Sequence, residues 1–159
     1  MVSIGTVTSP DQVASPDQVE AILTLLKAEG RRITTCRRLV VQALVGAGGH
    51  RTAEELAAFV QAGAPDIHLA SVYRNLDELE KVGVVSHVHL GHGPAVYHLA
   101  ADDHGHLVCR RCGVVTEAPR DVFAGLARTL RGRFGFWVDG QHFAVHGLCE
   151  ECATQELKP

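Results

Sequence analysis

Residues 69–99 read LASVYRNLDELEKVGVVSHVHLGHGPAVYHL, and this stretch decides the expected fold. It predicts a helix over roughly Leu69 to Val82, which Gly83 ends. Two short β-prone runs follow, Val84 to Leu90 and Ala95 to Leu99, and the GHGP segment between them predicts a hairpin turn. A helix followed by a two-stranded wing is the last part of a winged helix-turn-helix.

Three further helices are expected before this stretch. Ser15 suits the N-cap of the first one and Pro16 suits its first helical position, in the second of two SPDQV copies. The expected spans are roughly residues 16–29, 35–45 and 53–61. Together with the wing they predict a winged-helix domain over residues 16–100, preceded by a flexible tail at residues 1–15.

A second, smaller domain is expected after a polar, Gly-containing hinge at residues 101–105. It occupies residues 106–155 and follows the order strand, strand, helix, strand, at residues 106–109, 114–117, 121–134 and 142–147. The expected fold class is therefore mixed α/β, of the α+β kind: an N-terminal winged helix-turn-helix and a small C-terminal α/β domain.

Four of the five cysteines form two CxxC pairs, Cys109 with Cys112 and Cys149 with Cys152. Two such turns present four thiolates, which is the ligand set of a structural zinc site. The 36 residues between the pairs leave room for a strand–helix–strand unit. A domain this small needs a bound metal or a similar cross-link to be stable. The alternatives are a redox CxxC motif or unrelated buried cysteines. Cys36 stands alone, and no role is assigned to it.

The composition is that of an ordinary globular protein. Hydrophobic residues make up 46% and charged residues 21%, and the net charge is −3, so charge alone does not indicate a nucleic-acid partner. We find no apolar run long enough to span a bilayer and no secretory signal at the N-terminus, and we expect a cytoplasmic protein. We find no HExxH, no paired carboxylate beside the histidines and no nucleophile motif, and we expect neither an enzyme nor a small-molecule substrate.

Five segments together resemble the ferric uptake regulator (Fur) family. They occur in the family's order at residues 30–34, 50–56, 71–76, 104–113 and 147–152, and the resemblance covers roughly residues 20–153. It implies a homodimer whose C-terminal domain dimerises and binds metal. It also implies a repressor that binds palindromic double-stranded operator DNA when loaded with metal, and controls metal-homeostasis genes. A metal-buffering protein without DNA binding is the alternative outside this class.

Within the family, residues 83–93, 97–99 and 142–145 look most like the nickel-responsive branch of actinobacteria. The resemblance therefore favours nickel as the regulatory metal, with zinc or iron as alternatives. Two departures bear on the assignment. Cys36-Arg-Arg38 stands where the family usually has Pro-Gln-Arg, and the segment from His98 to His106 is one residue shorter than in relatives.

Two sets of histidines are predicted to bind the regulatory metal. His87 and His89 alternate in a predicted strand, so their rings should lie on one face, and the resemblance adds His142 from the second domain. The resemblance also implies a second set that bridges the domains: His50, His98, His104 and His106. His92 is a further possible ligand, and His146 has no assigned role.

The predicted DNA contacts lie near the start of the helix at residues 69–82. A recognition helix reaches base edges with its N-terminal residues, which here include Ser71, Tyr73 and Arg74. Arg74 can pair with a phosphate or with guanine, and Tyr73 can contact a thymine methyl or a phosphate. Arg32 stands where relatives place a basic residue that reaches the minor groove or the backbone, and the resemblance supports Tyr73 and Arg74 as contacts.

Overall fold

The computed structural model describes residues 16–90, 93–101, 104–138 and 144–156. These residues divide into two compact units. The first unit contains residues 16–87 and 95–101, and the second contains residues 88–90, 93–94, 104–138 and 144–156. No helix in the described part of the chain is long and apolar enough to cross a membrane.

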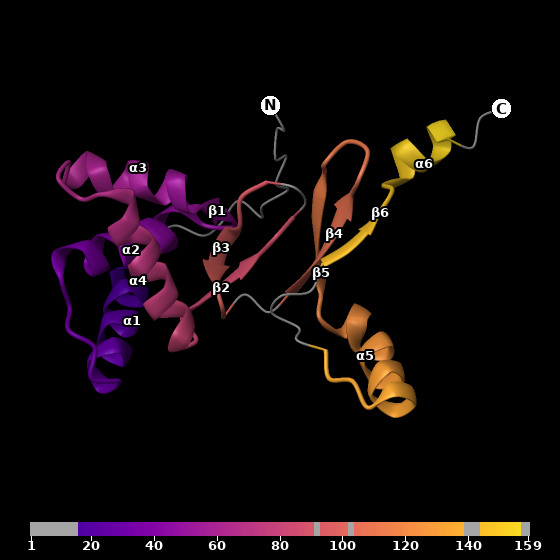
Figure 1. Ribbon diagram of the computed structural model, residues 1–159, viewed down its shortest axis with the longest axis horizontal. Coiled ribbons are helices and arrows are strands. Elements are labelled where there is room, and N and C mark those ends of the chain that lie inside the picture. The colour runs from indigo at the N-terminus through magenta and orange to yellow at the C-terminus, as the bar shows by residue number, and fades with distance from the viewer. Residues whose placement is uncertain (1–15, 91–92, 102–103, 139–143, 157–159) are drawn as a thin grey trace. The chain divides into compact units, whose positions relative to one another are not determined.

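Four helices build the first unit: α1 (Pro16–Ala28), α2 (Thr35–Ala47), α3 (Ala53–Gly63) and α4 (Leu69–Lys81) (Figure 1). They confirm the four predicted helices to within two residues at each end. Local chemistry sets several of these ends. Thr52 and Glu55 form a reciprocal capping box at the start of α3, and Gly83 adopts a φ of 70° just after α4, where a side chain would be strained.

A three-stranded sheet completes this unit, with the strand order β1-β3-β2. Its strands are β1 (Arg51–Thr52), β2 (Val85–Val88) and β3 (Val96–Leu99), and β1 pairs antiparallel with β3 (Figure 1). Strand β1 was not predicted, because two residues are too few to show the alternation of a strand. The predicted wing strands are present, but β2 ends at Val88 rather than at Leu90.

The core of the first unit is aliphatic and joins all four helices to the sheet. Its completely buried side chains include Leu23 of α1, Val40 of α2 and Val60 of α3. Burial of one such side chain stabilises the fold by about 1.5–3 kcal/mol. From α4 the core takes Val72, Leu76 and Leu79, so the opposite face of this helix is left for solvent or a partner.

The second unit is built on a sheet with the order β5-β4-β6. Strand β4 (His104–Cys109) pairs antiparallel with β5 (Val115–Pro119) and parallel with β6 (Ala144–Gly147) (Figure 1). The helices are α5 (Asp121–Phe134) and α6 (Glu150–Glu156), and α6 was not predicted.

Strand β4 starts two residues before its predicted start, because His104 and Gly105 pair with the end of β5. These two residues were predicted to lie in the hinge, and that placement was wrong. A Cβ at Gly105 would overlap the ring of Phe123, so a larger residue here would require that ring to move. The rest of the predicted hinge includes residues 102–103, which lie outside the described residues.

Helix α5 buries none of its side chains within the described part of the chain. Several large apolar residues on it and just after it are exposed: Val122, Leu126, Phe134, Phe136 and Trp137. Trp137 is 70% exposed although the guanidinium of Arg131 stacks 3.8 Å from the centre of its ring. An apolar surface of this kind on a small unit marks an interaction face.

Candidate metal centres and DNA-contact surface

The two CxxC motifs of the second unit meet at one point. The first leaves the end of β4 and turns at Gly113, whose amide donates to the carbonyl of Cys109 at 2.8 Å. The second leads into α6, and the amide of Arg110 ties the two segments by donating to the carbonyl of Gly147 at 3.0 Å. The Sγ atoms of Cys109, Cys112, Cys149 and Cys152 all lie within 4.8 Å of one another.

This spacing suits zinc. With Zn–S bonds of about 2.3 Å, the edges of a ZnS₄ tetrahedron are about 3.8 Å, and the Sγ atoms of Cys112 and Cys149 are 3.7 Å apart. All five cysteines of the chain are free thiols, so neither CxxC motif forms a disulfide. The four-cysteine cluster is therefore consistent with a zinc site.

The pKa values of Cys109 and Cys152 are shifted in opposite directions. The amides of Cys112 and Cys149, in that order of importance, lower the pKa of Cys109 to about 6. Burial, followed by the neighbouring thiols of Cys149 and Cys112, raises the pKa of Cys152 to about 12. A divalent cation held by the four sulfur atoms would favour their deprotonated forms, because it offsets the negative charge that gathers there.

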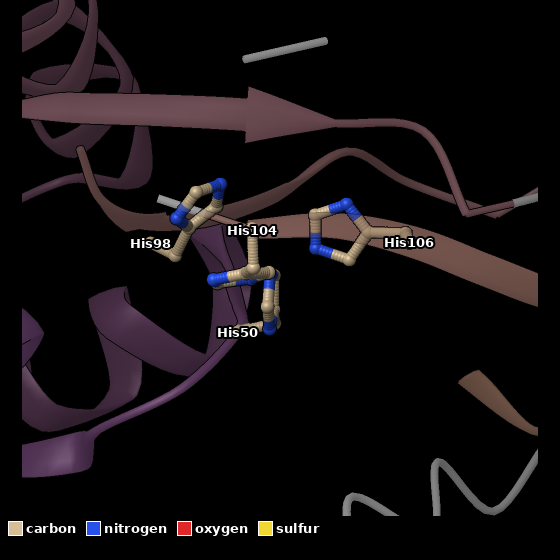
Figure 2. A group of neighbouring side chains, drawn as sticks. All are labelled: His50, His98, His104 and His106. Atoms are coloured by element: carbon tan, nitrogen blue, oxygen red, sulfur yellow. The ribbon is translucent and has the colours of Figure 1, made fainter. Parts of the chain in front are cut away.

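The first unit contains a buried pair of histidines. His50 lies just before β1 and His98 lies on β3, and they are only 6% and 3% exposed. Their ring centroids are 4.6 Å apart (Figure 2). Nδ1 of His98 is 3.1 Å from the carbonyl of Leu99. The pairing of β1 with β3 brings these residues together across 48 positions of sequence.

The second unit contains another such pair on β4. His104 and His106 have ring centroids 4.8 Å apart at 72°, and His106 is 1% exposed (Figure 2). Nε2 of His104 is 3.9 Å from Oε1 of Glu117 on β5. Glu117 was not predicted as a site residue. The antiparallel register sets it opposite His106, but no motif in the sequence marks that register.

Of the three histidines predicted to bind metal at the wing, the structure describes His87 and His89 but not His142. His87 lies on β2, and its Nδ1 is 2.6 Å from Oε1 of Glu80 on α4. His89 is exposed and follows the end of β2, so the expected alternation of His87 and His89 within one strand was wrong. His142 and His92 lie outside the described residues, and His146 is exposed on β6.

The predicted DNA contacts belong to the first unit. Arg74 on α4 is exposed, with its Nε donating to the carbonyl of Ala70 at 3.2 Å, and Ser71 is half-buried. Tyr73 donates its phenol proton to Oε1 of Glu54 at 2.9 Å, and this bond, followed by burial, raises the pKa of Tyr73. Arg32 is exposed before α2.

Arg37 links these elements. Its Nη1 donates to the carbonyl of Arg32 at 2.6 Å and its Nε donates to Oδ1 of Asn75 at 3.1 Å. The amide of Asn75 in turn donates to Sγ of Cys36 at 3.2 Å. Asn75 had no assigned role in the sequence analysis. Through Arg37, Asn75 connects the segment of Arg32 to the middle of α4.

Comparison with known proteins identifies relatives that match most of the chain. The family model described as the ferric uptake regulator family matches residues 28–145. The ferric uptake regulation protein of Bacillus subtilis (strain 168) is 30% identical over 147 residues, which cover 89% of this chain and 99% of that protein. The peroxide operon regulator of the same organism is 26% identical, with 87% and 96% covered.

The fold is also similar to a solved one. The structure of the Helicobacter pylori ferric uptake regulator, described as revealing three functional metal-binding sites, is 25% identical, with 89% of this chain and 96% of that chain covered. The TM-score is 0.67. These relatives are named for iron uptake and peroxide response, so they do not support the nickel branch. The chain belongs to the ferric uptake regulator family of metal-responsive transcription regulators.

Proposed function

We propose that this chain is a transcriptional repressor that binds palindromic operator DNA as a homodimer when its regulatory metal is bound. The observation that carries the proposal is the buried pair of His50 and His98 in the first unit. Imidazoles suit divalent transition metals, and here they lie in the same compact unit as α4. A metal bound by them acts directly on the unit that would read DNA.

DNA binding is assigned to the exposed side of α4 and to the segment before α2. The exposed guanidinium groups of Arg74 and Arg32 suit phosphates or guanine acceptors, and Ser71 and Tyr73 lie near the start of the same helix. The core holds the other side of α4, so this helix can enter a major groove without unpacking.

The structural metal is proposed to be one zinc ion per chain, held by Cys109, Cys112, Cys149 and Cys152. The observed Sγ spacing and the lowered pKa of Cys109 support this choice. Zinc bound there would contribute directly to the folding of the second unit, which has few buried apolar side chains among its described residues.

Two regulatory sites are proposed. One joins His50 and His98 with His104 and His106, and the other joins His87 and His89 with His142. Each draws on segments from both parts of the chain, so a bound cation would link the DNA-binding unit to the dimerisation unit. The metal then favours the DNA-ready arrangement by as much as its affinity differs between arrangements.

The homodimer is proposed to form through the second unit. Helix α5 has no side chain buried by the described residues, and the apolar residues Val122, Leu126 and Phe134 are exposed along it. A second copy of the chain is the occupant that a symmetric operator requires. The expected site of action is the cytoplasm, where the operator DNA lies.

Nickel is proposed as the regulatory metal, because both sets contain only histidines and the sequence looks most like the nickel-responsive branch. Zinc and iron are the alternatives. The test is a titration of DNA binding with nickel, zinc, iron(II) and manganese(II) on purified protein that retains its structural zinc. The protein should bind a palindromic operator most tightly with nickel. Binding of metal without any effect on DNA would instead identify a metal buffer.

A further inference from the structure

The last turn of α4 meets the wing through a carboxylate and an imidazole. Oε1 of Glu80 lies 2.6 Å from Nδ1 of His87, and the two side chains are 29% and 30% exposed. The ring of His87 also lies 5.8 Å from that of Tyr97 on β3. All three residues belong to the first unit, so this geometry does not depend on the second unit.

The contact selects one form of the imidazole. A neutral imidazole carries one N–H and one lone pair, whereas a carboxylate can only accept a hydrogen bond. The short contact therefore requires that Nδ1 of His87 carries the proton and donates it to Glu80. When the ring is neutral, its lone pair then lies on Nε2, and the side chain of His87 is 30% exposed, so a cation that displaces any proton from Nε2 can bind there.

We propose that Glu80 is a positioning residue that presents Nε2 of His87 to the regulatory metal and couples that metal to helix α4. The proposal rests on the proposed role of His87 as a metal ligand. Carboxylates that accept from the distal nitrogen of a metal-bound histidine fix its tautomer and orientation and raise its basicity.

The position of Glu80 gives the contact a second consequence. It lies on the same helix as Arg74, and the core holds this helix through Val72, Leu76 and Leu79. A metal bound by His87 is thus connected to the DNA-reading helix through the contact of His87 with Glu80, within one unit. This route would act alongside any change between the units. If the contact were only a surface ion pair, its loss would leave the affinity for the metal unchanged.

The test compares Glu80→Ala and Glu80→Gln with Asp77→Asn in the full-length, zinc-containing protein. Asp77 is an exposed acidic residue on the same helix, so its change matches the loss of charge. Nitrogen-15 spectra of the His87 imidazole should show the Nδ1–H tautomer in the parent protein and in Asp77→Asn. In Glu80→Ala the Nε2–H tautomer should become populated.

Nickel(II) is then titrated, and paramagnetic broadening of the His87 signals reports occupancy of this site in particular. Glu80→Ala should weaken nickel binding there by about 10–100-fold, as expected for loss of an outer partner. Glu80→Gln should reduce the affinity for nickel by less, because its amide oxygen still accepts a hydrogen bond. Asp77→Asn should leave the affinity for nickel unchanged. Thermal melting verifies that each variant is folded. If Glu80→Ala does not fold, Glu80→Gln tests the proposal in its place.

His87→Ala separates the two proposals. If this variant keeps full nickel-dependent DNA binding, the wing is not a sensing site and the proposed role of His87 fails. If His87→Ala abolishes that response but Glu80→Ala and Glu80→Gln keep the parent tautomer and nickel affinity, only the role of Glu80 is overturned.

Discussion

The phenol of Tyr73 on α4 donates a 2.9 Å hydrogen bond to Oε1 of Glu54 on α3. This bond is the main cause of the raised pKa of Tyr73, followed by burial. A phenol proposed to touch DNA is thereby held against the neighbouring helix before any DNA arrives.

The Tyr73–Glu54 bond has a predictable pH dependence. Because the pKa is higher in the folded state than in the unfolded state, the bond stabilises the fold below about pH 10 and is lost as the pH rises through the folded pKa. Glu54→Gln should shift the tyrosinate absorbance midpoint of Tyr73 to lower pH. The measurement is made in a Tyr97→Phe background, because Tyr97 is the only other tyrosine. An unchanged midpoint would show that the bond is absent in solution.

Arg74→Ala should greatly weaken operator binding while leaving the dimer and its metals intact. Loss of a bidentate base contact costs about 1–3 kcal/mol, whereas loss of a phosphate contact flattens the salt dependence. Fluorescence anisotropy at several salt concentrations distinguishes the two. Lys27→Ala, which removes an exposed cation from α1, is the control. If Arg74→Ala binds the operator with the affinity and the salt dependence of the parent protein, Arg74 does not contact DNA.

Cys109→Ser should release zinc and unfold or monomerise the second unit, because structural zinc is part of its folding free energy. Zinc content by atomic emission and mass by sedimentation report both effects. Cys36→Ser is the matched control, since Cys36 lies in the first unit, and it should keep a full complement of zinc. A stable dimer without zinc after Cys109→Ser would contradict the assignment.

Leu126→Glu should dissociate the proposed dimer. A charge buried in an apolar interface remains without compensation, and the proposed association is the process that would bury Leu126. Leu25 on α1 is equally exposed, at 45%, so Leu25→Glu is a control for the substitution itself. Sedimentation should give a monomer for Leu126→Glu and a dimer for Leu25→Glu. If Leu126→Glu is also a dimer, the interface lies elsewhere.

His87→Ala combined with His89→Ala should abolish metal-dependent operator binding, if the wing senses the metal. The zinc of the four-cysteine cluster, the dimer and weak non-specific DNA binding should remain. Gel-shift assays with and without nickel measure the response. A double variant that keeps the same metal dependence would assign sensing to His50, His98, His104 and His106 instead.

Much of this protein could be determined from the sequence by itself. Helix-period patterns and caps predicted α1 to α4, because a helix is stabilised by contacts among near neighbours and by its own end groups. The two CxxC motifs likewise predicted the cluster of four thiols, since each tight turn brings its own pair of sulfur atoms together.

Only the tertiary structure decided which distant residues meet. Strand β1 is two residues long and exists because β3 supplies its partner, and this pairing brings His50 beside His98. The register of β4 with β5 moved the start of β4 to His104 and set Glu117 nearby. The contact of Glu80 with His87 depends on how α4 packs against the wing. Such contacts are decided by the packing of the whole core and by strand register, and neither leaves a local pattern in the sequence.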